Sequence, residues 1–200
     1  MVDFSAERPC RILSLDGGGA KGFYTIGVLK GIEGMLGCRL HERFDLVFGT
    51  STGSIIAALI CLGHSVDEIH ELYRAHVVKV MGKWFPWTKS RALRKLATDV
   101  FGEQSFTDVR THIGVVATRW VTETPLVFKT AVAQAHGDRG NFEPGFGCTV
   151  GDAVQASCSA YPFFCRKWIT TDDREIILAA DGGYCANTLA AGQTPPPVFT

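Results

Sequence analysis

Hydrophobic residues follow two alternating patterns along the chain, and this alternation predicts the fold. Short apolar runs typical of β-strands occur at 11–15, 44–48, 113–121, 125–131 and 175–178. Apolar residues spaced at the helical period, or small and aliphatic throughout, predict helices over 24–36, 54–62, 66–80, 92–101 and 149–160. Strands that alternate with helices predict an α/β fold, built as a three-layer sandwich with a mostly parallel central sheet.

The same pass along the chain indicates one domain over residues 1–200, without repeats or a linker. Residues 81–90 read as irregular and aromatic, and 137–147 as a glycine-rich loop. The end of the chain, at 188–200, is rich in proline and is expected to be a frayed tail.

Composition narrows the classes of function. The formal net charge of +0 gives no basic surplus for nucleic acid. The chain has 7 cysteines without a C-x-x-C pair, which predicts reduced, mostly buried thiols in a cytoplasmic protein and no metal or other cofactor. The longest apolar run, at 55–62, is far short of the ~20 residues that a transmembrane helix needs, and the N-terminus has no apolar h-region, so neither a transmembrane helix nor a signal peptide is expected.

A glycine motif, Asp-Gly-Gly-Gly-Ala-Lys-Gly at 16–22, lies between the first strand and the first helix. Its Gly17, Gly19 and Gly22 match the fingerprint G-x-G-x-x-G of dinucleotide-binding folds, so an NAD(P)-binding oxidoreductase is one interpretation. That fingerprint expects an acidic residue at the end of the second strand, whereas Asp45 stands at the start of its strand.

The glycine motif also fits a second interpretation. Backbone N–H groups without flanking side chains can turn toward an anion at a helix N-terminus, including an oxyanion that exists only in a transition state. The donors of such an oxyanion hole would be Gly17, Gly18 and Gly19.

A second motif, Gly-Thr-Ser-Thr-Gly at 49–53, favours the oxyanion interpretation. It fits G-x-S-x-G between a strand and a buried helix, which is the context of a nucleophile elbow. The turn is so tight that side chains at Gly49 and Gly53 would collide with the strand and the helix, and Ser51 is held at its apex as a candidate nucleophile. The alternative is a helix N-cap without chemistry.

A nucleophilic serine needs a base, and none of the 6 histidines follows a late strand where an α/β hydrolase would place it. Asp181, in the triplet Asp181-Gly182-Gly183, directly follows the last strand, at the sheet edge where Ser51 is also expected. Partial burial there would raise its pKa and make it a better base. The alternative is an ordinary turn.

Together these motifs resemble those of the patatin-like phospholipase family. The resemblance covers about residues 11–187 and includes Ala-Ser-Cys-Ser-Ala-Tyr-Pro at 156–162, ahead of the aspartate. It implies a metal-free lipid acyl hydrolase that cleaves phospholipids or lysophospholipids through a Ser51–Asp181 dyad, with Gly17 to Gly19 as the oxyanion hole. It further implies that Lys21 lies near the lipid phosphate; the alternative is a solvated lysine at the start of the helix. The chain is similar, too, to bacterial patatin-like effectors that cyclic nucleotides activate, although no residue indicates such an activator.

The chain departs from the family pattern after Gly183. Family members continue with an Asn-Asn-Pro-like stretch and further helices, whereas this sequence reads Ala-Asn-Thr-Leu at 186–189 and soon ends in prolines. A truncated or short variant of a family member would depart from the pattern in this way. A catalytically inactive, patatin-shaped interaction module is therefore a further alternative.

An aromatic segment at 80–89 is the most membrane-like part of the chain. Trp84, Phe85 and Trp87 are interleaved with lysines, a combination that suits the interface of a bilayer with anionic headgroups. Peripheral membrane contact is one interpretation, and a loop folded onto the core or over the active site is the other.

Overall fold

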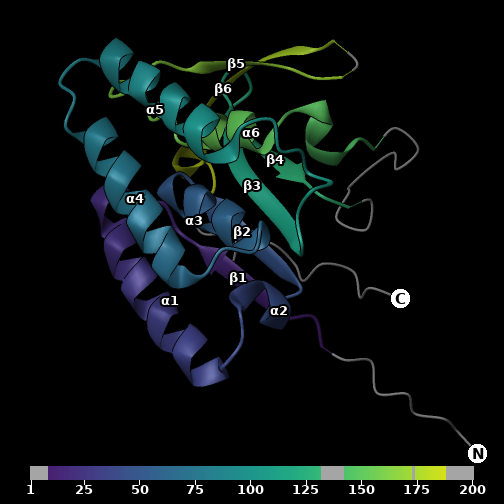
Figure 1. Ribbon diagram of the computed structural model, residues 1–200. Helices are drawn as coiled ribbons and strands as arrows, with labels where there is room; N and C mark the ends of the chain where they lie inside the picture. The colour runs from purple at the N-terminus through teal and green to yellow at the C-terminus, as the bar shows by residue number, and fades with distance from the viewer. Residues whose placement is uncertain (1–8, 132–141, 173, 188–200) are drawn as a thin grey trace, which may run out of the picture.

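A mixed six-stranded sheet is the base on which the rest of the protein is built (Figure 1). The computed structural model describes residues 9–131, 142–172 and 174–187, so the tail at 188–200 lies outside the described residues. The strands are β1 (Ile12–Leu15), β2 (Leu46–Thr50), β3 (His112–Arg119), β4 (Thr124–Lys129), β5 (Lys167–Thr170) and β6 (Ile176–Asp181). β1, β2 and β3 are parallel neighbours, whereas β4 and β6 each pair antiparallel with β3, and β5 pairs antiparallel with β6.

The helices lie in two layers against this sheet. The inner helices α3 and α6 pack on the strands, and α1, α4 and α5 form an arc outside them, from the lower left to the top of Figure 1. The α/β fold class is therefore confirmed. The helices are α1 (Gly22–Leu36), α2 (Leu40–Arg43), α3 (Thr52–Cys61), α4 (Val66–Met81), α5 (Pro86–Phe101) and α6 (Val150–Ser157), with 3₁₀ turns at Gly19–Lys21, Pro144–Gly147 and Gly182–Tyr184.

The two edges of β3 determine where the site forms. Residues 114–119 of β3 pair with β4, which occupies one edge. On the other edge β2 pairs with residues 112–116 and β6 with residues 117–119, so the two strands follow one another along the same edge. They run in opposite directions, with Thr50 opposite Val116 and Asp181 opposite Ala117. The carboxyl ends of β2 and β6 therefore meet head to head.

Helix α3 is the centre of the core. Every residue from Thr52 to Cys61 is buried, as expected for a helix that is apolar all round. Its small residues permit close contact, since a Cβ at Gly49 of β2 would lie 2.8 Å from the Cβ of Ala57. The N-terminus of α3 is thus fixed directly beyond the end of β2.

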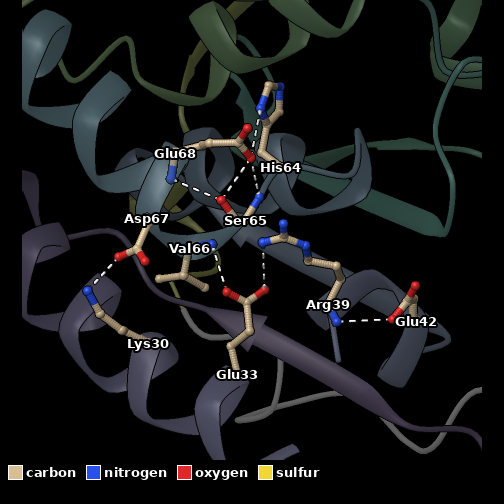
Figure 2. Close-up of polar contacts among 9 residues, drawn as sticks. All are labelled: Lys30, Glu33, Arg39, Glu42, His64, Ser65, Val66, Asp67 and Glu68. Atoms are coloured by element: carbon tan, nitrogen blue, oxygen red, sulfur yellow. Dashed lines mark hydrogen bonds and ion pairs between the residues drawn. The ribbon is translucent and has the colours of Figure 1, made fainter. Parts of the chain in front are cut away.

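A polar cluster joins α1, α2 and α4 at the side away from the glycine motif (Figure 2). Helix α4 begins with a capping box, with Ser65 and Glu68 as its two members. Glu33 of α1 adds a second cap, because its Oε2 accepts the Val66 N–H at 2.9 Å. Its other carboxylate oxygen lies 3.9 Å from the guanidinium of Arg39. A carboxylate at a helix N-terminus also compensates the helix dipole.

Several local expectations differ from the structure. The irregular aromatic segment is shorter than expected, because α5 already begins at Pro86, a residue suited to the first turn of a helix. The pattern missed β5 and α2, which have 4 residues each. The prediction that most cysteines are buried is wrong, since only Cys61, Cys148 and Cys158 are buried. In the described part of the chain, no helix is long and apolar enough to span a membrane.

Candidate active site

Ser51 lies at the apex of a tight turn between β2 and α3. Its backbone has φ 52° and ψ −126°, a conformation that costs a residue with a side chain about 1–3 kcal/mol. Cβ atoms at Gly49 and Gly53 would lie 2.5 and 2.2 Å from the carbonyl oxygens of Gly53 and Leu15, so both positions require glycine. Although Ser51 is the N-cap residue of α3, its side chain makes no cap hydrogen bond. The hydroxyl is thus available for another partner.

That partner is Asp181, at the end of β6. The Ser51 side chain lies close enough to the Asp181 carboxylate to lower its pKa, and the Gly183 N–H donates to that carboxylate at 2.8 Å. Asp181 is only 6% exposed. Burial raises the pKa of its carboxyl group, and the nearby Ser51 side chain and the Gly183 N–H offset part of that rise. A carboxylate of raised basicity beside a serine hydroxyl can accept the hydroxyl proton.

The last residue of α6 and the segment that follows it hold both residues in place. The Ser51 N–H donates to Ser157 Oγ at 2.8 Å, and this hydroxyl donates to the Val116 carbonyl. The Asp181 N–H donates to the carbonyl of Ser159 at 3.1 Å. Between them, the Cys158 thiol packs beside Ser51, and burial raises its pKa, so it stays protonated and does not compete as a nucleophile.

The glycine motif lies against the same turn. The Gly17 N–H donates to Asn187 Oδ1 at 3.1 Å, and the Gly18 N–H donates to Thr52 Oγ1 at 3.2 Å. A Cβ at Gly17 would lie 2.8 Å from the Cβ of Ser51, so this backbone directly adjoins the serine. Gly19 has φ +57°, the left-handed region that favours glycine.

Tyr73 of α4 fixes this loop from the outside. Its hydroxyl donates to the Gly19 carbonyl at 2.7 Å, and burial raises the pKa of Tyr73 to about 12. A Cβ at Gly22 would lie 2.1 Å from the same hydroxyl oxygen, which explains the last glycine of the motif. The loop is therefore held by a fixed donor and is preorganised.

An apolar cavity of about 350 Å³ opens beside Ser51, between α3, α4, α5 and the segment after α6. Its buried wall consists of aliphatic residues, and its exposed rim includes Met81 and Phe163. Such a cavity can take an alkyl chain next to the serine. The buried aliphatic residues of the wall are Ile55, Val77, Val80, Leu93 and Leu96.

The remaining sequence candidates lie elsewhere. Lys21 is exposed and does not line the cavity, as the solvated-lysine interpretation expects. Asp45 pairs with Arg11 where β1 and β2 begin, at the opposite end of these strands from the glycine motif. The described histidines do not line the cavity, and His136 lies outside the described residues. Within the described ranges, no group of three His, Cys, Asp or Glu side chains could hold a metal ion.

The aromatic side chains between α4 and α5 point into solvent rather than onto the core. Trp84 is 92% exposed, Phe85 56% and Trp87 62%. Phe85 and Trp87 stack on each other, with ring centroids 4.7 Å apart. This segment connects Met81 to Lys89, which both line the cavity. The interpretation in which these rings fold onto the core is therefore wrong.

Sequence reasoning missed several residues that support the site. Tyr73 was recognised only as part of an apolar helix face, and Thr52 only as a neighbour of the serine. No sequence signal distinguishes Ser157 from the other serines of its segment, because its role depends on β3. Asn187 and Lys89 contact the site from segments distant in the chain.

Comparisons with known proteins agree with this geometry. The family model described as patatin-like phospholipase matches residues 13–192. The cUMP-AMP-activated phospholipase of Escherichia coli is 59% identical over 187 residues, covering 94% of this chain and 58% of that protein. The cGAMP-activated phospholipase of Vibrio cholerae is 30% identical over 206 residues, covering 88% of this chain and 54% of that protein.

Among solved structures, VipD from Legionella pneumophila matches with a TM-score of 0.60 at 13% identity, which supports the fold alone. The match covers 96% of this chain and 48% of that one. Across these proteins, the chain corresponds to between 48% and 58% of their length.

Proposed function

Because the chain belongs to the patatin-like phospholipase family, we propose that it hydrolyses fatty acyl esters of phospholipids or lysophospholipids. The observation that carries this proposal is the closeness of the Ser51 side chain to the buried Asp181 carboxylate, whose pKa Ser51 lowers. It lies beside a cavity that can take an acyl chain. The alternative of an NAD(P)-dependent oxidoreductase has less support, because Asp45 is paired with Arg11 at the far end of the strands.

In the proposed reaction, Ser51 Oγ attacks the ester carbonyl carbon while Asp181 takes the hydroxyl proton. The tetrahedral intermediate then collapses, and the proton passes from Asp181 to the departing alcohol, leaving an acyl group on Ser51. Asp181 next takes a proton from water, which attacks the acyl-enzyme. The second tetrahedral intermediate collapses, the proton returns from Asp181 to Ser51 Oγ, and the fatty acid leaves. The pKa that burial raises makes Asp181 a better base than an exposed aspartate.

Charge on the carbonyl oxygen needs nearby donors during both steps. We assign this role to the N–H groups of Gly17, Gly18 and Gly19. The substrate oxygen would replace Asn187 Oδ1 as the acceptor for Gly17, and Thr52 Oγ1 as the acceptor for Gly18. The N-terminus of α3 adds favourable dipole charge at the same place.

The exposed aromatic segment supports a lipid surface as the source of substrate. Trp84, Phe85 and Trp87 favour the bilayer interface and lie next to residues of the cavity rim. We propose that this segment docks on the membrane. Replacing Trp84 and Trp87 together with alanine should weaken binding to anionic vesicles and slow hydrolysis of vesicle lipid, while hydrolysis of a monomeric ester is unchanged. Unchanged vesicle binding would refute the docking role.

Relatives named as cUMP-AMP-activated and cGAMP-activated phospholipases support a further part of the proposal, activation by a cyclic dinucleotide. Their names carry this part, because the described residues offer no independent sign of where such an activator binds. Titrating cUMP-AMP into the protein while following ester hydrolysis tests it. Activity that is the same with and without the nucleotide would contradict it.

The central test is labelling of the protein by a fluorophosphonate, detected by intact mass. The parent should gain one adduct, and Ser51→Ala should gain none at an equal melting temperature. A folded parent that stays unlabelled with and without cUMP-AMP would overturn the proposal and favour the inactive interaction module. Labelling that survives in Ser51→Ala would assign the nucleophile to another residue.

A further inference from the structure

Lys89 places a positive charge in an otherwise uncharged cavity. All residues that line the cavity belong to the described part of the chain, and among them Lys89 alone has a charged side chain. It comes from the first turns of α5, and its side chain is half-buried. Most of the wall around it is aliphatic or aromatic.

Two aromatic rings flank the Lys89 ammonium. Its nitrogen lies 5.8 Å from the ring centroid of Phe163 and 5.8 Å from that of Phe164, within the range of cation–π contacts. Within the described ranges, it forms no ion pair with a carboxylate. Aromatic faces compensate a partly desolvated ammonium group less well than an anion does, so an anionic ligand would be strongly favoured here.

We infer that Lys89 binds the phosphate of the substrate headgroup and makes the site prefer phosphate-bearing acyl esters over neutral ones. This inference rests on the proposed acyl hydrolysis at Ser51. In a glycerophospholipid the acyl ester and the phosphate are carried by the same glycerol, so both must be held close to Ser51. The acyl chain follows the aliphatic wall between α4 and α5, and the headgroup remains at the rim with Lys89.

Lys89 also has a competing structural role, which the test must separate. Its contacts with Phe163 and Phe164 help to hold the segment after α6 against α5, as does the hydrogen bond from the Cys165 N–H to Ser90 Oγ. A purely structural lysine would affect every substrate alike. A phosphate-binding lysine would affect only substrates with the phosphate.

The experiment compares two monomeric substrates with the same acyl chains, dihexanoylphosphatidylcholine and dihexanoylglycerol, both below the concentrations at which they aggregate. Lys89→Met should lower kcat/KM for the phospholipid by about tenfold or more and leave the neutral ester unchanged, because a charge-assisted contact is lost. Lys89→Arg should retain most of the preference. Lys95→Met, which removes an exposed lysine of the same helix outside the cavity, is the matched control and should change neither value. Equal losses on both substrates, or no loss on either, would overturn the inference.

A binding measurement separates this inference from the proposed catalysis. A non-hydrolysable dihexyl ether analogue of the phospholipid should bind the parent at least about tenfold more tightly than Lys89→Met by calorimetry, whether or not esters are cleaved. Equal binding would overturn the role of Lys89 even if hydrolysis is observed. Inorganic phosphate at micromolar concentration should not compete with the analogue; competition would assign Lys89 to a free phosphate ligand instead.

Discussion

The hydroxyl of Ser157 connects the candidate nucleophile to the sheet, so its removal gives a sharp test of how the site is held. In Ser157→Ala the Ser51 N–H loses its acceptor and the Val116 carbonyl loses one donor. One orphaned donor in a largely buried place costs about 1–3 kcal/mol. For a chain of this size, each kcal/mol lowers the melting temperature by about 2–4 °C. We therefore expect a loss of about 2–12 °C.

The same bond holds the unusual backbone conformation of Ser51, so the substitution should also affect reactivity. If the turn relaxes by about 1.4 kcal/mol, labelling by a fluorophosphonate slows about tenfold. Ser159→Ala is a matched control, because Ser159 is also buried but its hydroxyl donates only to the Gln155 carbonyl of its own segment. This variant should label at the rate of the parent. The reasoning is refuted if both variants label at the parent rate, or if both slow equally.

Three other predictions concern charge and packing, two of them at the site and one at the N-terminus of α4. Because burial raises the pKa of Asp181, labelling should fall as the pH drops through a value above about 4, the ordinary range of aspartate. The fold favours the protonated form of Asp181, so the stability that Asp181 contributes falls as the pH rises through the same window. Asp181→Asn should therefore melt at or above the parent temperature at pH 7, while it loses labelling by the fluorophosphonate. Gly53→Ala should fail to fold or lose labelling, because its Cβ would lie 2.2 Å from the Leu15 carbonyl oxygen; a folded, fully labelled variant would contradict this. Glu33→Ala removes the second cap of α4 and should cost about 1–3 kcal/mol in urea unfolding, whereas Asp67→Ala, which breaks an exposed ion pair, should leave the unfolding curve nearly unchanged.

The sequence predicts long elements well, because a continuous apolar pattern specifies them locally. The helices that became α1, α3 and α4 were located within a few residues. The 4-residue strand β5 was missed because its residues alternate too briefly to form a pattern, and only pairing with β6 stabilises it as a strand. The sequence could not predict the strand directions, since the alternation of strands and helices does not reveal that β4 and β6 are antiparallel to β3.

The candidate site shows the same limit. The motifs indicated that Ser51 and Asp181 should lie close together, and the structure brings their side chains near each other. The expected reason was a shared edge of parallel strands, whereas the actual reason is the head-to-head approach of β2 and β6 along β3. Supporting contacts such as Gly17 to Asn187 link residues that are 170 positions apart, and no local pattern encodes them.

The head-to-head arrangement of β2 and β6 also affects how the protein acquires activity as it folds. The two strands do not pair with each other, and β3 is the strand with which both of them pair. The pairings join Thr50 to Val116 and Ala117 to Asp181, so two long loops must close before Ser51 and Asp181 meet. Closing long loops is entropically costly, and such non-local contacts form slowly. During refolding, helical signal should therefore return before the serine becomes reactive, and labelling would mark the completion of the fold.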